Sequence, residues 1–280
     1  MEEKMEGKNV NSWEEFKLEL DNLRREHGKA PNTDSSSSLL FRGQKNSGWK
    51  LETTLDRWRK RMLFQDYYRV ISRIRPQIES FTGKEWLIPE YPDVEKRAAS
   101  YEFDIDLWAG GYPAYAYMAY LRHHGFPSPL LDWSRSPYVA AYFAFSKVNE
   151  KPSERVSIFV LSKTSFKLHG TGMPVVYYPG QYVNTHRRHF LQQSEYTLCL
   201  EADGVQGTKW HFEQYHTVFD DGHRQQGICK KFTIPAAERA KVLHELNEYN
   251  INAFSLFGSE ESLMDTLATR EFCFPPESSE

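Results

Sequence analysis

The sequence has no excess of basic residues. Its 280 residues include 35 Lys and Arg against 38 Asp and Glu, which gives a formal net charge of -3 and a pI near 6.4. Nucleic-acid-binding domains usually carry a basic excess, because contacts to phosphate supply most of their affinity. The composition therefore argues against general nucleic-acid binding, without excluding it.

Cysteine is scarce, and long apolar runs are missing. The three cysteines, Cys199, Cys229 and Cys273, show neither the spacing of a disulfide framework nor that of a metal-ligand set. We therefore expect reduced thiols and a cytoplasmic protein. The first ten residues are charged, and no run approaches the ~18 apolar residues that a membrane-spanning helix needs. We expect neither secretion nor membrane insertion.

Several catalytic motifs are also missing. The chain contains no P-loop and no G-x-G-x-x-G, so the sequence gives no support to a Walker or Rossmann nucleotide site. It has no G-x-S-x-G elbow that would activate Ser134 or Ser136 as a nucleophile. His123 and His124 are consecutive, so on a regular element they would point in different directions, and the other histidines are scattered. We expect no metal site.

The order of patterns predicts one domain over residues 1–280, of the α+β class. Ser12 and Glu15 form a capping box at the start of a helix expected over about 11–24. A short strand is expected over about 39–44, and a helical insertion over about 57–121. A strand-rich half follows over about 129–235, and helices over about 236–269 close the chain. The even spread of aromatic residues favours a single large core.

The segment HHGFPSPLLDWSRSPYVAAYFAF, residues 123–145, combines a loop, a buried strand and the start of a helix. Ser136 followed by Pro137 is typical of an N-cap and a first helical position. The polar residues on this approach are His123, His124, Asp132, Ser134, Arg135 and Ser136. A helix N-terminus offers free N–H groups to an anion such as phosphate. The same spacing also fits a capped, buried helix whose serines serve only its own backbone.

Arg42 lies at the polar end of the apolar strand LLFRGQ, directly before Gly43. A planar guanidinium group can clamp a phosphate or a carboxylate, and glycine lets backbone or ligand approach closely. Arg42 could equally pair with a structural Asp or Glu. Gln44 extends the polar surface and could line a pocket or form part of a turn.

A third polar cluster lies in RRHFLQQSEYTLCLE, residues 187–201. If this segment is one strand, Gln193 and Glu195 share a face, whereas Ser194 and Tyr196 point away. An amide beside a carboxylate could hold a ribose hydroxyl and stabilise a developing oxocarbenium cation. The alternative is the exposed polar face of an edge strand.

Four segments, LLFRGQ, RHHGFPSPLLDWSRSPYVAAYFAF, RRHFLQQSEYTL and FTIPAAERAKVLHELNEYNINAFSLF, occur in this order over about residues 11–272. Together they resemble the FRG domain family, named for a Phe-Arg-Gly signature that is Phe41, Arg42 and Gly43 here. The order of Arg, Ser and Gln-x-Glu is similar to the Arg-Ser-Glu pattern of ADP-ribosyltransferases. That resemblance implies a split mixed or antiparallel sheet with N-terminal and inserted helices.

The resemblance also implies NAD as a substrate and a reaction without metal. Arg42 would contact the diphosphate or the nicotinamide ribose, and Ser134 would support Arg42 and the ribose. Glu195 would be the catalytic carboxylate, with Gln193 beside it. The residues expected to contact NAD are Arg42, Gly43, Gln44, His123, His124, Asp132, Ser134 and Ser136. The chain departs from the family at Arg122, where Gln is usual, and at Ser194, where Gly is usual.

We therefore expect an NAD-consuming enzyme that transfers ADP-ribose to a macromolecular acceptor or hydrolyses NAD. A bacterial toxin or an anti-phage defence effector would fit, with a neutralising or sensor partner. Two alternatives stay open. One is a module that binds a nucleotide or ADP-ribose without turnover. The other is a protein or nucleic-acid interaction domain that uses the seven basic residues between Arg57 and Arg75.

Overall fold

The computed structural model describes residues 6–29, 39–100, 102–147, 154–163, 173–180, 183–203, 209–219 and 228–274. Its strands are β1 (Glu6–Asn9), β2 (Leu39–Gln44), β3 (Met62–Leu63), β4 (Leu131–Ser134), β5 (Arg155–Ser162), β6 (Pro174–Tyr177), β7 (Ser194–Asp203), β8 (Lys209–Phe212) and β9 (Ile228–Pro235). Its α-helices are α1 (Trp13–Lys29), α2 (Phe64–Thr82), α3 (Tyr91–Ala98), α4 (Glu102–Trp108), α5 (Tyr115–His123), α6 (Pro137–Phe145), α7 (Arg188–Leu191), α8 (Tyr215–Phe219), α9 (Arg239–Glu248), α10 (Ala253–Phe257) and α11 (Glu260–Cys273). A 3-10 turn, η2 (Ala236–Glu238), precedes α9.

The described strands form one mixed sheet in the order β1-β9-β5-β2-β4-β7-β8-β3, with β6 also paired to β7. Only the β1–β9 pair is parallel among these strand pairs. The α+β class and the mixed sheet agree with the sequence prediction. The strand expected over 39–44 is β2, and the segment expected to be helical over 57–121 contains α2 to α5 together with β3.

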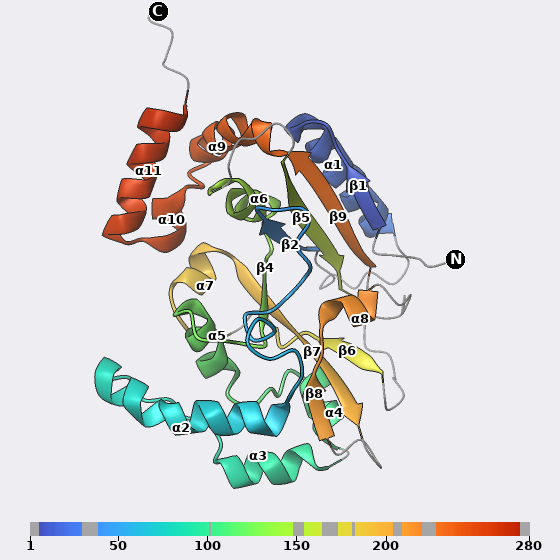
Figure 1. The fold of residues 1–280 in the computed structure, drawn as a ribbon, viewed down its shortest axis with the longest axis vertical. Coiled ribbons are helices and arrows are strands. Elements are labelled where there is room, and N and C mark those ends of the chain that lie inside the picture. The colour runs from blue at the N-terminus through green and yellow to red at the C-terminus, as the bar shows by residue number, and fades with distance from the viewer. Residues whose placement is uncertain are drawn as a thin grey trace, which may run out of the picture.

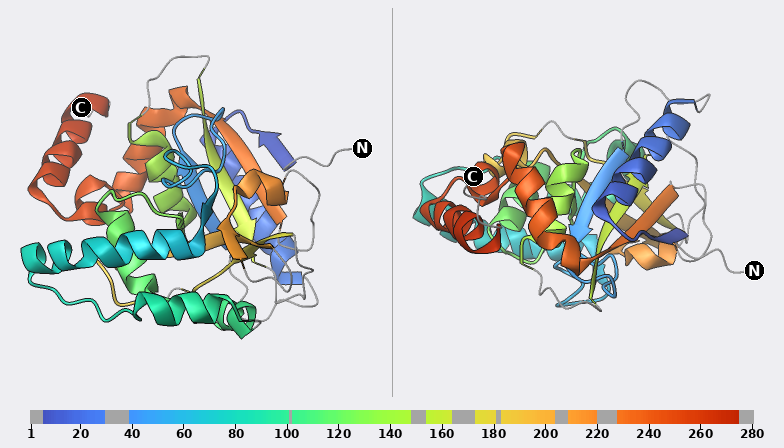
Figure 2. Two further views of the ribbon diagram at one scale, coloured as in Figure 1. Left: turned by 60° about the horizontal axis from the view of Figure 1, so that its bottom comes forward. Right: turned by 90° about the horizontal axis from the view of Figure 1, so that it is seen from above.

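Three apolar clusters surround this sheet. The first lies between α2 to α5 and strands β7 and β8, in the lower half of Figure 1. The second lies in the upper half, where α1, α6, α9 and α10 cover β2, β5 and β9. The third includes Leu40, Trp133, Phe159 and Tyr215. In all three views α11 lies beside α10, at the opposite side of the molecule from β1 (Figure 1, Figure 2).

Helix α1 begins where the capping box predicts, but only the Ser12 half of the box forms, because Glu15 reaches back to Asn11 instead of Ser12. The Ser12 hydroxyl accepts a hydrogen bond from the Glu15 N–H at 3.1 Å, and the Glu15 carboxylate accepts one from the Asn11 N–H at 2.7 Å. Trp13 and Phe16 are fully buried, and Phe16 packs against Phe232 of β9. The helix is longer than expected, since it continues to Lys29.

Helix α6 packs directly on β2. Seven of its nine residues are buried, and it begins at Pro137 with Ser136 as its N-cap. A Cβ atom at Gly43 would lie 1.8 Å from the Ala140 carbonyl oxygen and 2.8 Å from the Ala144 nitrogen. Glycine is therefore required at position 43 because the backbone of α6 occupies the space of a side chain. Among the described helices, none has both the length and the apolar character to cross a membrane.

Candidate functional site

A cleft opens between β2, β4 and the start of α6. Strands β2 and β4 pair through a single register position, Phe41 opposite Ser134, whereas β2 and β5 pair along the whole of β2. Because β2 and β4 part beyond that position, a cleft of about 250 Å³ forms beside them. Its wall includes Arg42, Gln44 and Asp132.

Arg42 is held by Asp132. Its Nη1 donates to Asp132 Oδ1 and to the Asp132 carbonyl oxygen, both at 2.7 Å. The Arg122 Nη2 donates to the same Oδ1 at 2.7 Å. Desolvation raises the pKa of the Asp132 carboxyl, but the Arg122 and Arg42 guanidinium groups outweigh it and hold that pKa well below its usual range. The pairing with a structural acid, left open by the sequence, is what the structure shows.

Two buried polar atoms in the cleft wall have no hydrogen-bond partner among the described residues. They are Arg42 Nε and Gln44 Oε1. The Gln44 side chain is 7% exposed, and its Nε2 donates to the Lys50 carbonyl oxygen at 3.1 Å, which fixes the direction of the amide. Buried donors and acceptors normally have partners. This wall therefore contains one buried donor and one buried acceptor whose hydrogen-bonding capacity the described residues leave unused.

The cleft is strongly cationic. Its lining contains four basic residues, Arg42, Lys45, Arg57 and Lys147, and one acidic residue, Asp132. Trp49 also lines it, with 44% of its surface exposed, and the Lys45 ammonium lies 5.9 Å from the centre of the Trp49 ring. Positive charge gathered in a hollow concentrates anions there. The lining thus combines a cationic wall with an exposed aromatic ring.

The two serines of the β4–α6 junction serve the backbone. Ser134 Oγ donates to the Gln192 carbonyl oxygen at 2.8 Å and accepts from the Ser136 N–H at 3.0 Å. Ser136 Oγ accepts from the Val139 N–H at 3.3 Å. Ser134 lines the cleft, but Arg42 takes its support from Asp132 rather than from Ser134. This is the capped-helix alternative that the spacing allowed.

The model of the FRG domain family matches residues 37–153. The chain carries an FRG domain. The match contains β2 and the β4–α6 segment, so both walls that hold Arg42 and Asp132 lie within it. No curated protein and no solved structure matches the chain. The third and fourth segments of the resemblance, which include Glu195, lie outside the residues of the FRG match.

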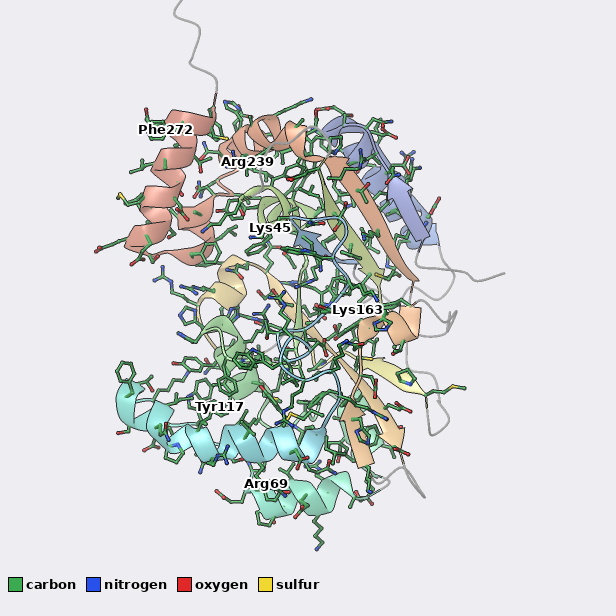
Figure 3. All side chains as sticks on the ribbon, in the orientation of Figure 1. Lys45, Arg69, Tyr117, Lys163, Arg239 and Phe272 are labelled. Atoms are coloured by element: carbon green, nitrogen blue, oxygen red, sulfur yellow. The ribbon has the colours of Figure 1, made fainter. Side chains whose placement is uncertain are left out.

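Glu195 lies on the other face of the sheet from the cleft. The β4–β7 register places Ser134 opposite Ser194 and Trp133 opposite Glu195. Since alternate residues of a strand point to opposite faces, Glu195 shares a face with Trp133, away from Ser134. The Glu195 side chain is fully buried and forms an ion pair with Lys163. In Figure 3, the label of Lys45 beside α6 marks the cleft, and the label of Lys163 beside α8 marks the partner of Glu195.

The alternation predicted that Gln193 and Glu195 lie on one strand, but Gln193 lies outside it. Strand β7 begins at Ser194, and Gln193 has a left-handed backbone with a φ of 47°. Its carbonyl oxygen accepts from the Arg135 N–H at 3.0 Å, which ties the turn after α7 to the β4–α6 junction. The prediction of a shared Gln-x-Glu face was therefore wrong, because the turn reverses the chain between the two residues. The alternative of an exposed polar face was wrong too, since Glu195 is buried.

The two consecutive histidines do not line the cleft, and both contact His186. His123 is the last residue of α5, and its Nε2 lies 2.6 Å from the Tyr196 hydroxyl. The rings of His123 and His124 both contact His186, with centroid separations of 6.1 and 5.1 Å. The expectation that they diverge applied to a regular element, and both reach His186 because α5 ends at His123 and leaves His124 outside the helix. No group of three or more His, Cys, Asp or Glu suited to a metal ion occurs among the described residues.

Five of the predicted residues therefore meet at the cleft of the FRG domain, and five lie elsewhere. Those at the cleft are Arg42, Gly43, Gln44, Asp132 and Ser134, whereas Ser136, His123, His124, Gln193 and Glu195 do not line it. Sequence reasoning missed the basic lining residues Lys45, Arg57 and Lys147 as members of one site. The signal was present for Lys45, which directly follows the signature strand, whereas Arg57 was considered only as one of the seven basic residues from Arg57 to Arg75.

Proposed function

We propose that the FRG domain binds NAD or an ADP-ribose-like nucleotide in the β2–β4–α6 cleft, with the diphosphate against Arg42. The observation that carries this proposal is the state of Arg42. Asp132 fixes its guanidinium group through Nη1, while the buried Nε has no partner among the described residues. A guanidinium group fixed in this way can bind phosphate with little loss of side-chain entropy.

The other lining residues fit the same ligand class. Lys45, Arg57 and Lys147 add positive charge that two phosphates would neutralise. The half-exposed ring of Trp49 offers a surface for stacking. A volume of about 250 Å³ is at the small end of ligand pockets, which are about 300–1,000 Å³. The cleft would therefore enclose the diphosphate and one attached group rather than a whole dinucleotide.

Turnover of NAD is the second candidate function. The observation that favours it is Asp132, a carboxylate in the cleft wall whose pKa lies well below its usual range. A carboxylate that stays ionised can stabilise the oxocarbenium cation that forms when the glycosidic bond of NAD breaks. Asp132 replaces Glu195 in this role, since Glu195 is buried on the other face. Binding without turnover ranks first, because the Asp132 charge already serves two guanidinium groups.

Kinship with the ADP-ribosyltransferase fold forms part of the same proposal. It is supported by the adjacency of β2, β4 and β7 in a mixed sheet with inserted helices. A macromolecular acceptor, a neutralising or sensor partner, and a role as a toxin or an anti-phage effector would follow from turnover. They are proposals that depend on it.

Calorimetry with NAD and with ADP-ribose tests binding. Lys209 of β8 is an exposed cation outside the cleft, so Lys209→Ala is a matched control for Arg42→Ala. We expect stoichiometric binding by the wild type and by Lys209→Ala. Arg42→Ala should bind about tenfold more weakly or worse, because it loses a charge-assisted contact of about 1.5–3 kcal/mol. Equal affinity of all three proteins, or no binding by the wild type, would refute the proposed site.

Release of nicotinamide from NAD separates the two functions. If the domain turns NAD over, Asp132→Asn should abolish release while the protein stays folded by circular dichroism. Glu195→Gln should release nicotinamide as fast as the wild type when the rate is divided by the fraction of protein that is folded. Loss of release in a folded, NAD-binding Glu195→Gln protein would return the catalytic role to Glu195. No release by the wild type, together with binding, identifies a binding module.

A further inference from the structure

A second set of cations lies away from the cleft, where α5, α7 and the end of α2 meet. We call it the α5–α7 cationic surface, and it consists of Lys84, His124, His186, Arg187 and Arg188. Lys84 follows the Gly83 C-cap of α2, and His124 caps α5. His186 and Arg187 directly precede α7, and Arg188 is its first residue. The His124 ring contacts the His186 ring, and Arg187 and Arg188 directly follow His186 in the chain. Desolvation lowers the pKa of His186 most, and all four of the other residues lower it further, so the five side chains lie near one another.

The permanent charges of this surface have no carboxylate partner among the described residues. Lys84, Arg187 and Arg188 form none of the ion pairs found there, although many other basic residues do. Arg188 contributes to the lowered pKa of one carboxyl group, that of Glu261. The main cause there is a hydrogen bond from Ser259, and Arg188 is the smallest of the causes. Ion pairing therefore leaves this positive charge uncompensated in the described structure.

Arg188 has few of its donors engaged. Its Nη1 reaches the His123 carbonyl oxygen at 3.5 Å, and its buried Nε has no partner among the described residues. The guanidinium group lies 5.5 Å from the centre of the Phe257 ring. Lys84 is placed in the same way, with its ammonium 3.9 Å from the centre of the Trp86 ring. Aromatic rings hold both cations in position without neutralising them.

We propose that the α5–α7 cationic surface is a second anion site, separate from the cleft, that binds phosphate groups. A guanidinium group with free donors, an ammonium group and two imidazole rings match the several oxygens and the charge of a phosphate. Free phosphate and the backbone of a single-stranded nucleic acid share this chemistry. The proposal does not rest on nucleotide binding in the cleft.

The two imidazole rings make this site sensitive to pH. Partial desolvation, with Arg188 and other nearby cations, lowers the pKa of His124 and of His186. The groups that face these rings are Tyr120 and His123 from α5, Arg187 and Arg188 beside α7, and Lys84. A bound anion favours the protonated rings, so binding takes up protons. Inorganic phosphate also gains a proton in this range, so the pH readout is an oligonucleotide, whose phosphodiester charge stays constant. Its affinity should rise as the pH falls from about 8 to about 6.

The test is a titration of the Arg42→Ala protein with inorganic phosphate, followed by NMR of the histidine ring protons. Arg42→Ala weakens the cleft as a phosphate site, so the signals of His124 and His186 report on this surface alone. We expect saturable shifts at these two residues. The double variant Lys84→Ala, His186→Ala should weaken the response of His124 about tenfold, whereas Lys209→Ala should leave it unchanged.

A second arm uses a short single-stranded oligonucleotide and fluorescence anisotropy at several salt concentrations. Tighter binding than phosphate, with a steep salt dependence that the double variant reduces, identifies a nucleic-acid backbone as the source. Weaker or absent oligonucleotide binding, with saturable phosphate binding, identifies free phosphate or a mononucleotide. Shifts that never saturate and no oligonucleotide binding, or binding that the double variant leaves unchanged, would overturn the proposal. An inactive cleft would not affect either readout.

Discussion

The two faces of the β4–β7 pair carry one carboxylate each, and the contrast between them decides the chemistry of the site. Asp132 lines the cleft and holds two guanidinium groups, Arg42 and Arg122. Glu195 is fully buried on the other face and pairs with Lys163. Both acids have cationic partners, but only Asp132 and its partner Arg42 line the cleft. Charge pairing alone therefore does not mark a functional acid, and the face of the strand does.

The largest effect is expected from Glu195→Ala. Removing this carboxylate leaves the Lys163 ammonium beside a buried apolar region, and breaking a buried pair in this way costs about 3–5 kcal/mol. Chemical denaturation measures the loss in the free energy of unfolding. The double variant Glu195→Met, Lys163→Met removes both charges and should recover most of that loss. A cost below about 1 kcal/mol for Glu195→Ala would show that the pair is solvated, and so would weaken the contrast between the faces.

An intermediate effect is expected on the pH dependence of the free energy of unfolding, through His123 beside Tyr196. Burial lowers the pKa of His123 to about 4, so between about 6.5 and 4 the unfolded chain binds a proton that the folded protein does not. The free energy of unfolding should therefore fall as the pH decreases through this range, by up to about 1.4 kcal/mol per pH unit from this group. Denaturation across the range measures the slope.

The matched variants for this slope are His123→Gln and His244→Gln. His123→Gln removes the titrating group beside Tyr196, so the slope should become shallower. His244 lies on α9 and is half exposed, so His244→Gln is the control substitution and should leave the slope as it is. An unchanged slope in His123→Gln would show that His123 is not the titrating group.

The smallest effect is expected from Arg122→Gln, which restores the residue usual in the family. Glutamine can still donate to Asp132 Oδ1, but it removes one of the two charges that lower the pKa of that carboxyl. We expect nucleotide affinity to change by about threefold or less, because Arg42 keeps its own bond to Asp132. NMR should show the carboxyl pKa moving up towards its usual range. A change in affinity of tenfold or more would show that Arg122 takes part in binding.

The sequence predicted the parts of this structure that local chemistry determines. The Ser12 N-cap, the strand containing Arg42 and the Ser136–Pro137 helix start follow from propensities of neighbouring residues, and each is present. The face of Glu195 depended on where β7 begins. A one-residue change in register moves every side chain of a strand to the other face. Gln193 has a left-handed backbone, a conformation that glycine usually marks in a sequence, but no glycine stands at this position. Alternation therefore placed Gln193 on the same strand face as Glu195.

The composition of the cleft was beyond local prediction for a different reason. Arg57 and Lys147 are 90 residues apart in the chain, and the tertiary packing alone brings both to Arg42. The overall charge of -3 concealed this local excess, since the acids that balance it lie elsewhere. The same holds for the α5–α7 cationic surface, whose members come from three segments.

Gly43 and α6 form a contact without a side-chain layer between them, since the Ala140 carbonyl fills the position of a Cβ atom. Because the two backbones are in direct contact, β2 cannot slide along α6 without a steric clash, and the two elements must move as one rigid body. Arg42, next in the chain, travels with that body. Adjustment of the site to ligands of different size is therefore expected from the connection after β2, which contributes Lys45, Trp49 and Arg57 to the lining.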